Sequence, residues 1–340
     1  MRLTNGYVGL DVLSNVRPVL MGMATVMILY CHSGYWCKEM PSMLKSFLMM
    51  GYLGVDIFLF ISGIGMYFSW NKKNEERKSI MHWYTKRYVR VLVPYLFICI
   101  PIYGILLWLD QSSLSTFICN VTTLSYWLYH KGAWYVAMLM PLYFLTPLLI
   151  KYLSGQYGWW YFIILTSICY FCALFLAYYP PEPNGLVHNI AFVVYRLPTY
   201  FLGIALAPYI YRSVKIKKNA IIIISILCLL AMCVLYMVNM PFEMFATIII
   251  IVISCYIFSL PDPLIVNCRK VFTKLGKVSL ESYLFNIFLP LLLIRIDWDF
   301  ILYPGINEGN YVMYATTIIL GLFLSFSCNW LTKKTMYQCV

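Results

Sequence analysis

Three ionisable side chains stand inside long apolar stretches of this sequence, where charge is costly. His32 lies near the end of the first stretch, Asp56 near the start of the second, and Arg196 within the sixth. A histidine can act as a general base near neutral pH, a carboxylate can orient it, and a guanidinium can stabilise an anion. Together they would suit the activation of a hydroxyl group, provided that the fold brings them together.

Helical geometry predicts one common depth for these three residues. His32 follows Arg17 by fifteen residues, which is about 22 Å along a helix. If the second and sixth stretches begin on the opposite side, Asp56 lies about 8 Å and Arg196 about 10 Å below their outer ends. The alternative is that Asp56 and Arg196 neutralise each other and that His32 is wetted from outside. The spacing leaves both interpretations open.

A second candidate site is predicted toward the other membrane face. Arg87 and Arg90 stand three residues apart in YTKRYVRVLVPY, so a helix places them on one face, about 4.5 Å apart along its axis. Two guanidinium groups suit phosphate, although basic residues here can also anchor a helix to lipid phosphates. Glu281 and Asn286, in the ninth stretch, could line the same route or hydrogen-bond helices together.

The elements that carry these residues must be membrane helices. The 340 residues are 62% hydrophobic and 11% charged, against roughly 25% charged in an average soluble chain. So few charges cannot cover a water-facing surface, and the composition therefore excludes a soluble fold. No polar stretch is long enough to fold alone. We therefore predict a single integral membrane domain over residues 1–340.

The predicted fold is an all-α polytopic bundle of about ten transmembrane helices. A bilayer core needs about 20 apolar residues per helix, and runs of that length recur along the chain. The ten runs cover 17–36, 51–70, 88–109, 134–153, 159–179, 189–211, 219–239, 242–260, 277–296 and 311–331.

Lysine and arginine predict the orientation, because they remain preferentially on the cytoplasmic side of short loops. With the N-terminus inside, twenty of the 25 fall on the cytoplasmic side, four fall outside, and Arg196 lies within a helix. Both termini are therefore predicted to be cytoplasmic. The net charge of +12 then reflects topology, so we expect no nucleic-acid partner.

The twelve cysteines predict packing rather than metal binding or cross-linking. Most stand within apolar runs, where a thiol behaves as a small buried hydrophobe. The CxxC formed by Cys169 and Cys172 has no second pair or histidine nearby, so we predict no metal site. The cysteines expected to be buried include Cys99, Cys169, Cys172, Cys228, Cys233, Cys255 and Cys328.

Five segments in order along the chain resemble the membrane-bound acyltransferase 3 family over nearly the full length. They are GYLGVDIFLFISG from Gly51, YTKRYVRVLVPYL from Tyr84, WYVAMLMPLYFLTPLL from Trp134, RLPTYFLGIALA from Arg196 and LGKVSLESYL from Leu275.

The resemblance implies transfer of an acyl group, commonly acetyl, from cytoplasmic acetyl-CoA to a glycan or lipid-linked saccharide outside a bacterial plasma membrane. Acetyl-CoA would be a donor substrate, and no cofactor would be bound permanently. We expect His32 to be the base or a transient acyl carrier, with Asp56 as its partner. Arg87 and Arg90 would bind the phosphates of CoA. The remaining candidates, for acceptor or oxyanion contacts, are Arg196, Glu281 and Asn286.

Two positions depart from the family pattern. The family usually has arginine or lysine eleven positions before its histidine, where this chain has Met21 and carries Arg17 one helical turn earlier. Many relatives have a histidine at the position of Asn286.

Two other classes of function remain as alternatives. A transporter could use the buried His, Asp and Arg groups as a proton or anion relay. A polymerase or ligase acting on lipid-linked glycans would not use CoA at all. Consumption of acetyl-CoA separates the acyltransferase from both.

Overall fold

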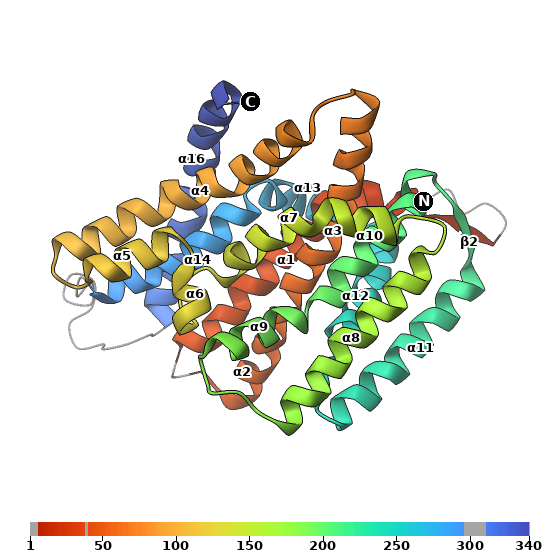
Figure 1. Ribbon diagram of the computed structural model, residues 1–340, viewed down its shortest axis with the longest axis horizontal. Coiled ribbons are helices and arrows are strands. Elements are labelled where there is room, and N and C mark those ends of the chain that lie inside the picture. Colours follow the sequence, from red (N-terminus) through yellow and green to blue (C-terminus); the bar gives the residue numbers. More distant parts are fainter. Residues whose placement is uncertain (1–5, 38–39, 296–310, 340) are drawn as a thin grey trace.

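The computed structural model describes residues 6–37, 40–295 and 311–339, and these are almost entirely helical (Figure 1). The all-α prediction is confirmed. In order the elements are β1 (Tyr7–Gly9), α1 (Asp11–Trp36), α2 (Ser42–Met49), the 3-10 helix η1 (Met50–Leu53), α3 (Gly54–Glu75), α4 (Ile80–Trp108), α5 (Leu114–Val121), α6 (Leu124–Tyr129), α7 (Trp134–Leu153), α8 (Gly158–Tyr178), α9 (Leu186–Val194), α10 (Leu197–Tyr211), β2 (Lys215–Lys217), α11 (Lys218–Met237), α12 (Glu243–Ile257), α13 (Pro263–Gly276), α14 (Ser279–Arg295) and α16 (Tyr311–Cys339).

Each of the ten predicted runs falls on helix, but two of them do not form a full span alone. Among the described residues, eight helical segments are long and apolar enough to cross a membrane. The eighth run is α12, whose 15 residues extend about 22 Å, less than a bilayer core of about 30 Å. The ninth run is α14, which reaches spanning length only together with α13 across a bend of 66°. The chain is a multi-pass membrane protein, and its described part has eight candidate spans, or nine if the bent pair α13 and α14 forms one.

Close backbone contact between α3 and α10 forms the centre of the bundle. A Cβ atom built on Gly63 would lie 2.5 Å from the carbonyl oxygen of Tyr200, and one on Gly203 would lie 2.2 Å from that of Phe60. Helices in a membrane pack through such small residues because their backbones can then approach closely. This contact brings Asp56 of α3 close to the start of α10, where Arg196 stands.

Glycines also allow α13 to pack closely against α1. A Cβ atom on Gly22 would lie 1.9 Å from the carbonyl oxygen of Phe272, and one on Gly276 would lie 2.3 Å from that of Pro18. The corner between α13 and α14 is therefore held beside the first part of α1.

Helix α11 lies at the edge of the bundle (Figure 1), where it packs against α12. Cys228 is the buried residue of α11, and most of its other side chains are isoleucine, leucine and similar apolar groups that remain exposed. An apolar helix with so little protein contact is expected to face lipid.

Several basic segments lie on one face of the bundle. Strand β1 pairs antiparallel with β2, which sets the start of α1 beside the connection from α10 to α11. The hydroxyl of Tyr211 donates to Glu75 Oε1 at 2.7 Å, so the ends of α10 and α3 meet there as well. Figure 1 shows the N-terminal strand and the end of α16 on this same side. We call it the basic face, and it is the face that the positive-inside rule predicts to be cytoplasmic.

Candidate functional site

A cavity of about 560 Å³ enters the bundle between α1, α3, α4, α7 and the corner of α13 and α14. Helix α1 lines it with Ser14, Arg17, Pro18, Met21 and Ile28. Each of these positions lies three, four or seven residues from another of them, so one face of α1 follows the cavity over about 21 Å. The volume lies within the range of small-molecule sites.

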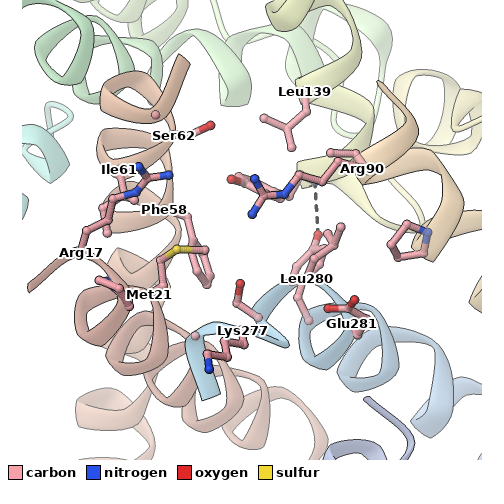
Figure 2. A pocket seen from close by; sticks show the side chains of 18 of the residues that line it. Arg17, Met21, Phe58, Ile61, Ser62, Arg90, Leu139, Lys277, Leu280 and Glu281 are labelled. Carbon is pink, nitrogen blue, oxygen red and sulfur yellow. Dashed lines mark hydrogen bonds between the residues drawn. The ribbon is translucent and has the colours of Figure 1, made fainter. Parts of the chain in front are cut away.

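Positive charge dominates the mouth of the cavity. The cations that line it are Arg17, Arg87, Arg90, Lys277 and Lys333, whereas Glu281 is the one acid in its described lining. In Figure 2, Arg17 and Arg90 extend into the space from opposite sides, with Lys277 and Glu281 below them. A phosphate-bearing ligand would complement this arrangement.

The packing of α4 turns the two arginines toward the cavity. The hydroxyls of Tyr84 and Tyr88 donate to backbone carbonyls of α7 at 3.0 and 2.9 Å, which fixes the rotation of α4 against that helix. Arg87 and Arg90 then face the cavity together, as their spacing predicted. The Nε of Arg87 is buried and has no hydrogen-bond partner among the described residues.

Arg17 lines the same cavity, although the sequence alone gave it no role in the site. A Cβ atom on Gly65 of α3 would lie 2.7 Å from Arg17 Nη2, so the guanidinium occupies space that only a glycine leaves open. The sequence feature that could have indicated this position is the departure from the family pattern. Met21 stands where the family usually has a basic residue and is an apolar part of the lining, while Arg17, one turn earlier, supplies the cation.

The inner part of the cavity is largely apolar. Its walls include Ile28, Val55, Phe58 and Leu139, together with the ring of Tyr135. Ile28 precedes His32 by one helical turn on the same face of α1, so the cavity ends just below His32.

His32 meets α14 at this upper end. Its Nδ1 lies 2.6 Å from Nδ2 of Asn286, a side chain that is only 2% exposed. The Oδ1 atom of the same amide is buried without a hydrogen-bond partner in the part of the chain that the structure describes. The sequence predicts that Asn286 contacts acceptor or oxyanion, whereas the structure places its amide against the imidazole.

Asp56 and Arg196 form an ion pair with each other across the bundle. Asp56 is fully buried, Arg196 is 6% exposed, and Arg196 Nη1 donates to Asp56 Oδ2. The guanidinium also lies over the rings of Tyr52, Phe192 and Trp134 at 5.1, 5.3 and 5.8 Å. The pair therefore joins α3 to the start of α10, which favours the interpretation in which these two charges neutralise each other.

Glu281 lies in the cavity and not beside His32. Its Oε1 accepts a hydrogen bond from Asn329 Nδ2 of α16 at 2.8 Å, and its side chain is almost fully buried. Of the three residues predicted to contact acceptor or oxyanion, Glu281 is the one that lines this cavity. It lines the cavity together with Arg90 and Lys333.

A second cavity, of about 340 Å³, lies at the far end of α11 from the basic face. Its lining includes Tyr195, Tyr236, Asn239 and Glu243, and none of the predicted site residues. Glu243 Oε2 is buried there without a hydrogen-bond partner among the described residues.

No cysteine lines either cavity in the described part of the chain. No group of three or more His, Cys, Asp or Glu side chains there could hold a metal ion. Of the seven cysteines expected to be buried, Cys172 is half-buried and Cys233 is exposed on α11, and the other five are buried. Cys233 differs because α11 faces lipid, which accepts a thiol as readily as a protein core does.

Comparison with protein-family models matches an acyltransferase domain to residues 19–333. Searches of curated proteins and of solved structures found no match. The matched region contains His32, both α4 arginines and most of the cavity lining, and the resemblance noted in the sequence is confirmed. The chain belongs to the membrane-bound acyltransferase 3 family and is a multi-pass membrane acyltransferase.

Proposed function

We propose that this protein transfers an acetyl group from cytoplasmic acetyl-CoA to a hydroxyl of a surface or exported polysaccharide at a bacterial plasma membrane. The observation that carries the proposal is the cavity with a cationic mouth at the basic face and an apolar inner end below His32.

The donor half of the site follows from charge. Acetyl-CoA carries several phosphates, which cannot enter lipid without large desolvation cost, so they remain at the mouth. Arg17, Arg87 and Arg90 would bind them through charge-assisted hydrogen bonds. The rest of the donor extends along the apolar wall, and its thioester reaches toward His32, about 22 Å above Arg17 on α1.

The acceptor half follows from the position of His32. A sugar hydroxyl is a poor nucleophile until a base removes its proton, and a neutral imidazole can do so. The resulting oxygen attacks the thioester carbonyl, the C–S bond breaks, and the CoA sulfur leaves with the proton that His32 accepted. The products are an acetyl ester and CoA. Asp56 and Arg196 hold α3 and α10 in register around this centre and take no part in the bond changes.

Labelled acetyl-CoA tests this proposal directly. Purified protein in nanodiscs, mixed with labelled acetyl-CoA and candidate polysaccharides, is expected to move label onto glycan and release CoA. Release of no CoA with any acceptor would contradict an acyltransferase that uses this donor. Movement of a solute across vesicles without release of CoA would support the transporter.

The variant His32→Gln is expected to abolish transfer, because glutamine keeps polarity but cannot cycle a proton. A loss of about 10² to 10⁴ in rate is typical when a general base is removed. Acetyl-CoA binding should be retained, since the phosphates bind far below. Transfer by His32→Gln near the wild-type rate would show that His32 is structural.

A further inference from the structure

We propose that Asn286 is a positioning residue that holds His32 in the tautomer protonated on Nδ1, which leaves Nε2 unprotonated and able to act as the base. The proposal rests on the proposed function for its catalytic consequence. Its structural part, the link between Asn286 and the state of the ring, can be measured without any turnover.

The amide and the ring are held against each other by packing. Asn286 lies on α14 with 2% of its surface exposed, and its amide approaches His32 Nδ1 to 2.6 Å. Helix α14 is fixed in rotation by Tyr283, whose hydroxyl accepts from the backbone N–H of Tyr135 at 3.2 Å. Leu284 and Phe288, on either side of Asn286, are fully buried. The contact is therefore a fixed feature of the interface between α1 and α14.

The end of the amide that faces Nδ1 decides where the ring carries its proton. If the amide nitrogen donates, Nδ1 must accept, Nε2 holds the proton, and no lone pair remains for a hydroxyl proton. If the amide oxygen faces the ring, Nδ1–H donates to it and Nε2 keeps its lone pair. The two arrangements differ by half a turn of the amide and occupy the same space.

The second arrangement also satisfies an orphaned acceptor. Oδ1 of Asn286 is buried and has no hydrogen-bond partner among the residues that the structure describes. Buried polar atoms are nearly always hydrogen-bonded, because a buried atom without a hydrogen bond costs free energy. Turning Oδ1 toward Nδ1–H gives this oxygen a donor and gives the base its lone pair, while the NH2 group takes the position that Oδ1 leaves.

Nitrogen-15 NMR of the full chain, labelled at histidine and held in nanodiscs, tests the tautomer. The chain has four histidines, and His32→Gln identifies the signal of His32 by its loss. We expect Nδ1–H in the wild type. In Asn286→Leu, which keeps the volume but removes the acceptor, we expect a mixture of tautomers. In Asn286→Asp, whose carboxylate also accepts from Nδ1–H, we expect Nδ1 to remain protonated.

Kinetics of the same variants test the consequence. Asn286→Leu should lower kcat by about 10²-fold or more, since the wrong tautomer cannot act as a base, while the KM for acetyl-CoA stays unchanged. Asn286→Asp should recover a large part of that loss. The control is Asn267→Asp, which makes the same charge change at an exposed asparagine of α13 and should leave both constants unchanged. Retained acetyl-CoA binding shows that each variant is folded.

Three results would overturn the inference: an Nε2–H tautomer of His32 in the wild type, an unchanged tautomer in Asn286→Leu, or an unchanged kcat in that variant. If instead the tautomer depends on Asn286 but no acceptor is acetylated by the wild type, the proposed function fails and the control of His32 by Asn286 stands.

Discussion

The charged residues of this protein differ in what their side chains face. Arg17, Arg87 and Arg90 face a cavity, whereas Arg196 faces the carboxylate of Asp56. A guanidinium beside open space can bind an added anion, while one already paired has its charge compensated. The same residue type therefore lines a cavity in α4 and joins two helices at the start of α10.

The α4 pair is expected to bind the donor. Arg87→Ala or Arg90→Ala should weaken acetyl-CoA binding roughly tenfold to a hundredfold, the range for loss of charge-assisted hydrogen bonds. Lysine replacements should recover only part, because a point charge lacks the bidentate geometry. Equilibrium binding in detergent measures this, and Arg212→Ala, at the end of α10 and outside the cavity, is the control. Unchanged affinity in both alanine variants would make the pair a lipid anchor.

The buried ion pair is expected to control stability. Asp56→Asn leaves Arg196 charged and uncompensated in the bundle, which should cost about 3 to 5 kcal/mol and lower the thermal midpoint. The double variant Asp56→Leu with Arg196→Met should lose less, because neither charge remains. Thermal unfolding followed by intrinsic fluorescence compares them. An Asp56→Asn protein with wild-type stability and no transfer activity would instead place Asp56 in the chemistry.

At the scale of elements, two glycines of α3 serve different purposes two residues apart. Gly63 meets the backbone of α10, which cannot move aside, while Gly65 meets the end of the flexible Arg17 side chain. The helix therefore uses one glycine for packing and the next for the shape of the cavity.

Alanine at these two positions should separate stability from binding. Gly65→Ala should leave the thermal midpoint unchanged or raised, because alanine favours helix by about 1 kcal/mol, yet weaken acetyl-CoA binding by displacing Arg17. Gly63→Ala should lower the midpoint, because its Cβ would lie 2.5 Å from a backbone oxygen. Full acetyl-CoA affinity in Gly65→Ala would remove Arg17 from the donor site.

At the scale of the whole molecule, the basic face defines the direction of the proposed reaction. The cationic residues of the cavity lie toward that face, and His32 lies near the opposite end of α1. A donor made in the cytoplasm and an acceptor outside the membrane then approach from opposite sides.

Reporter insertions test this orientation. Insertions at Glu76 and Lys217 should face the cytoplasm, because both lie at the basic face, and one at Gly185, before α9, should face outside. Alkaline phosphatase is active outside the membrane and green fluorescent protein folds inside, so the two reporters give opposite readings. Gly185 and Lys217 on the same side would contradict the predicted topology.

The sequence by itself determined that the chain lies mostly in lipid, where its helices run along the chain, and which family it belongs to. Each residue prefers lipid or water largely independently of its distant neighbours, so ten apolar runs were enough to place the helices. Arg87 and Arg90 were also predictable as a pair, because three residues on one helix share a face whatever surrounds them. The lengths of α12 and α14 were less predictable, because the apolar runs in the sequence extend beyond the residues at which these helices begin or end.

Only the tertiary structure decided which side chains meet. His32 and Asn286 are 254 residues apart in the chain, and Asp56 and Arg196 are 140 apart. Equal depth in the membrane made a triad of His32, Asp56 and Arg196 reasonable, but depth fixes only one coordinate of three. The other two depend on which helices pack together and how each is rotated. Close packing at the glycines of α3 and α10 places Asp56 beside Arg196. Close packing at the glycines of α1 and α13 holds the start of α14 beside α1, and His32 meets Asn286 between these two helices.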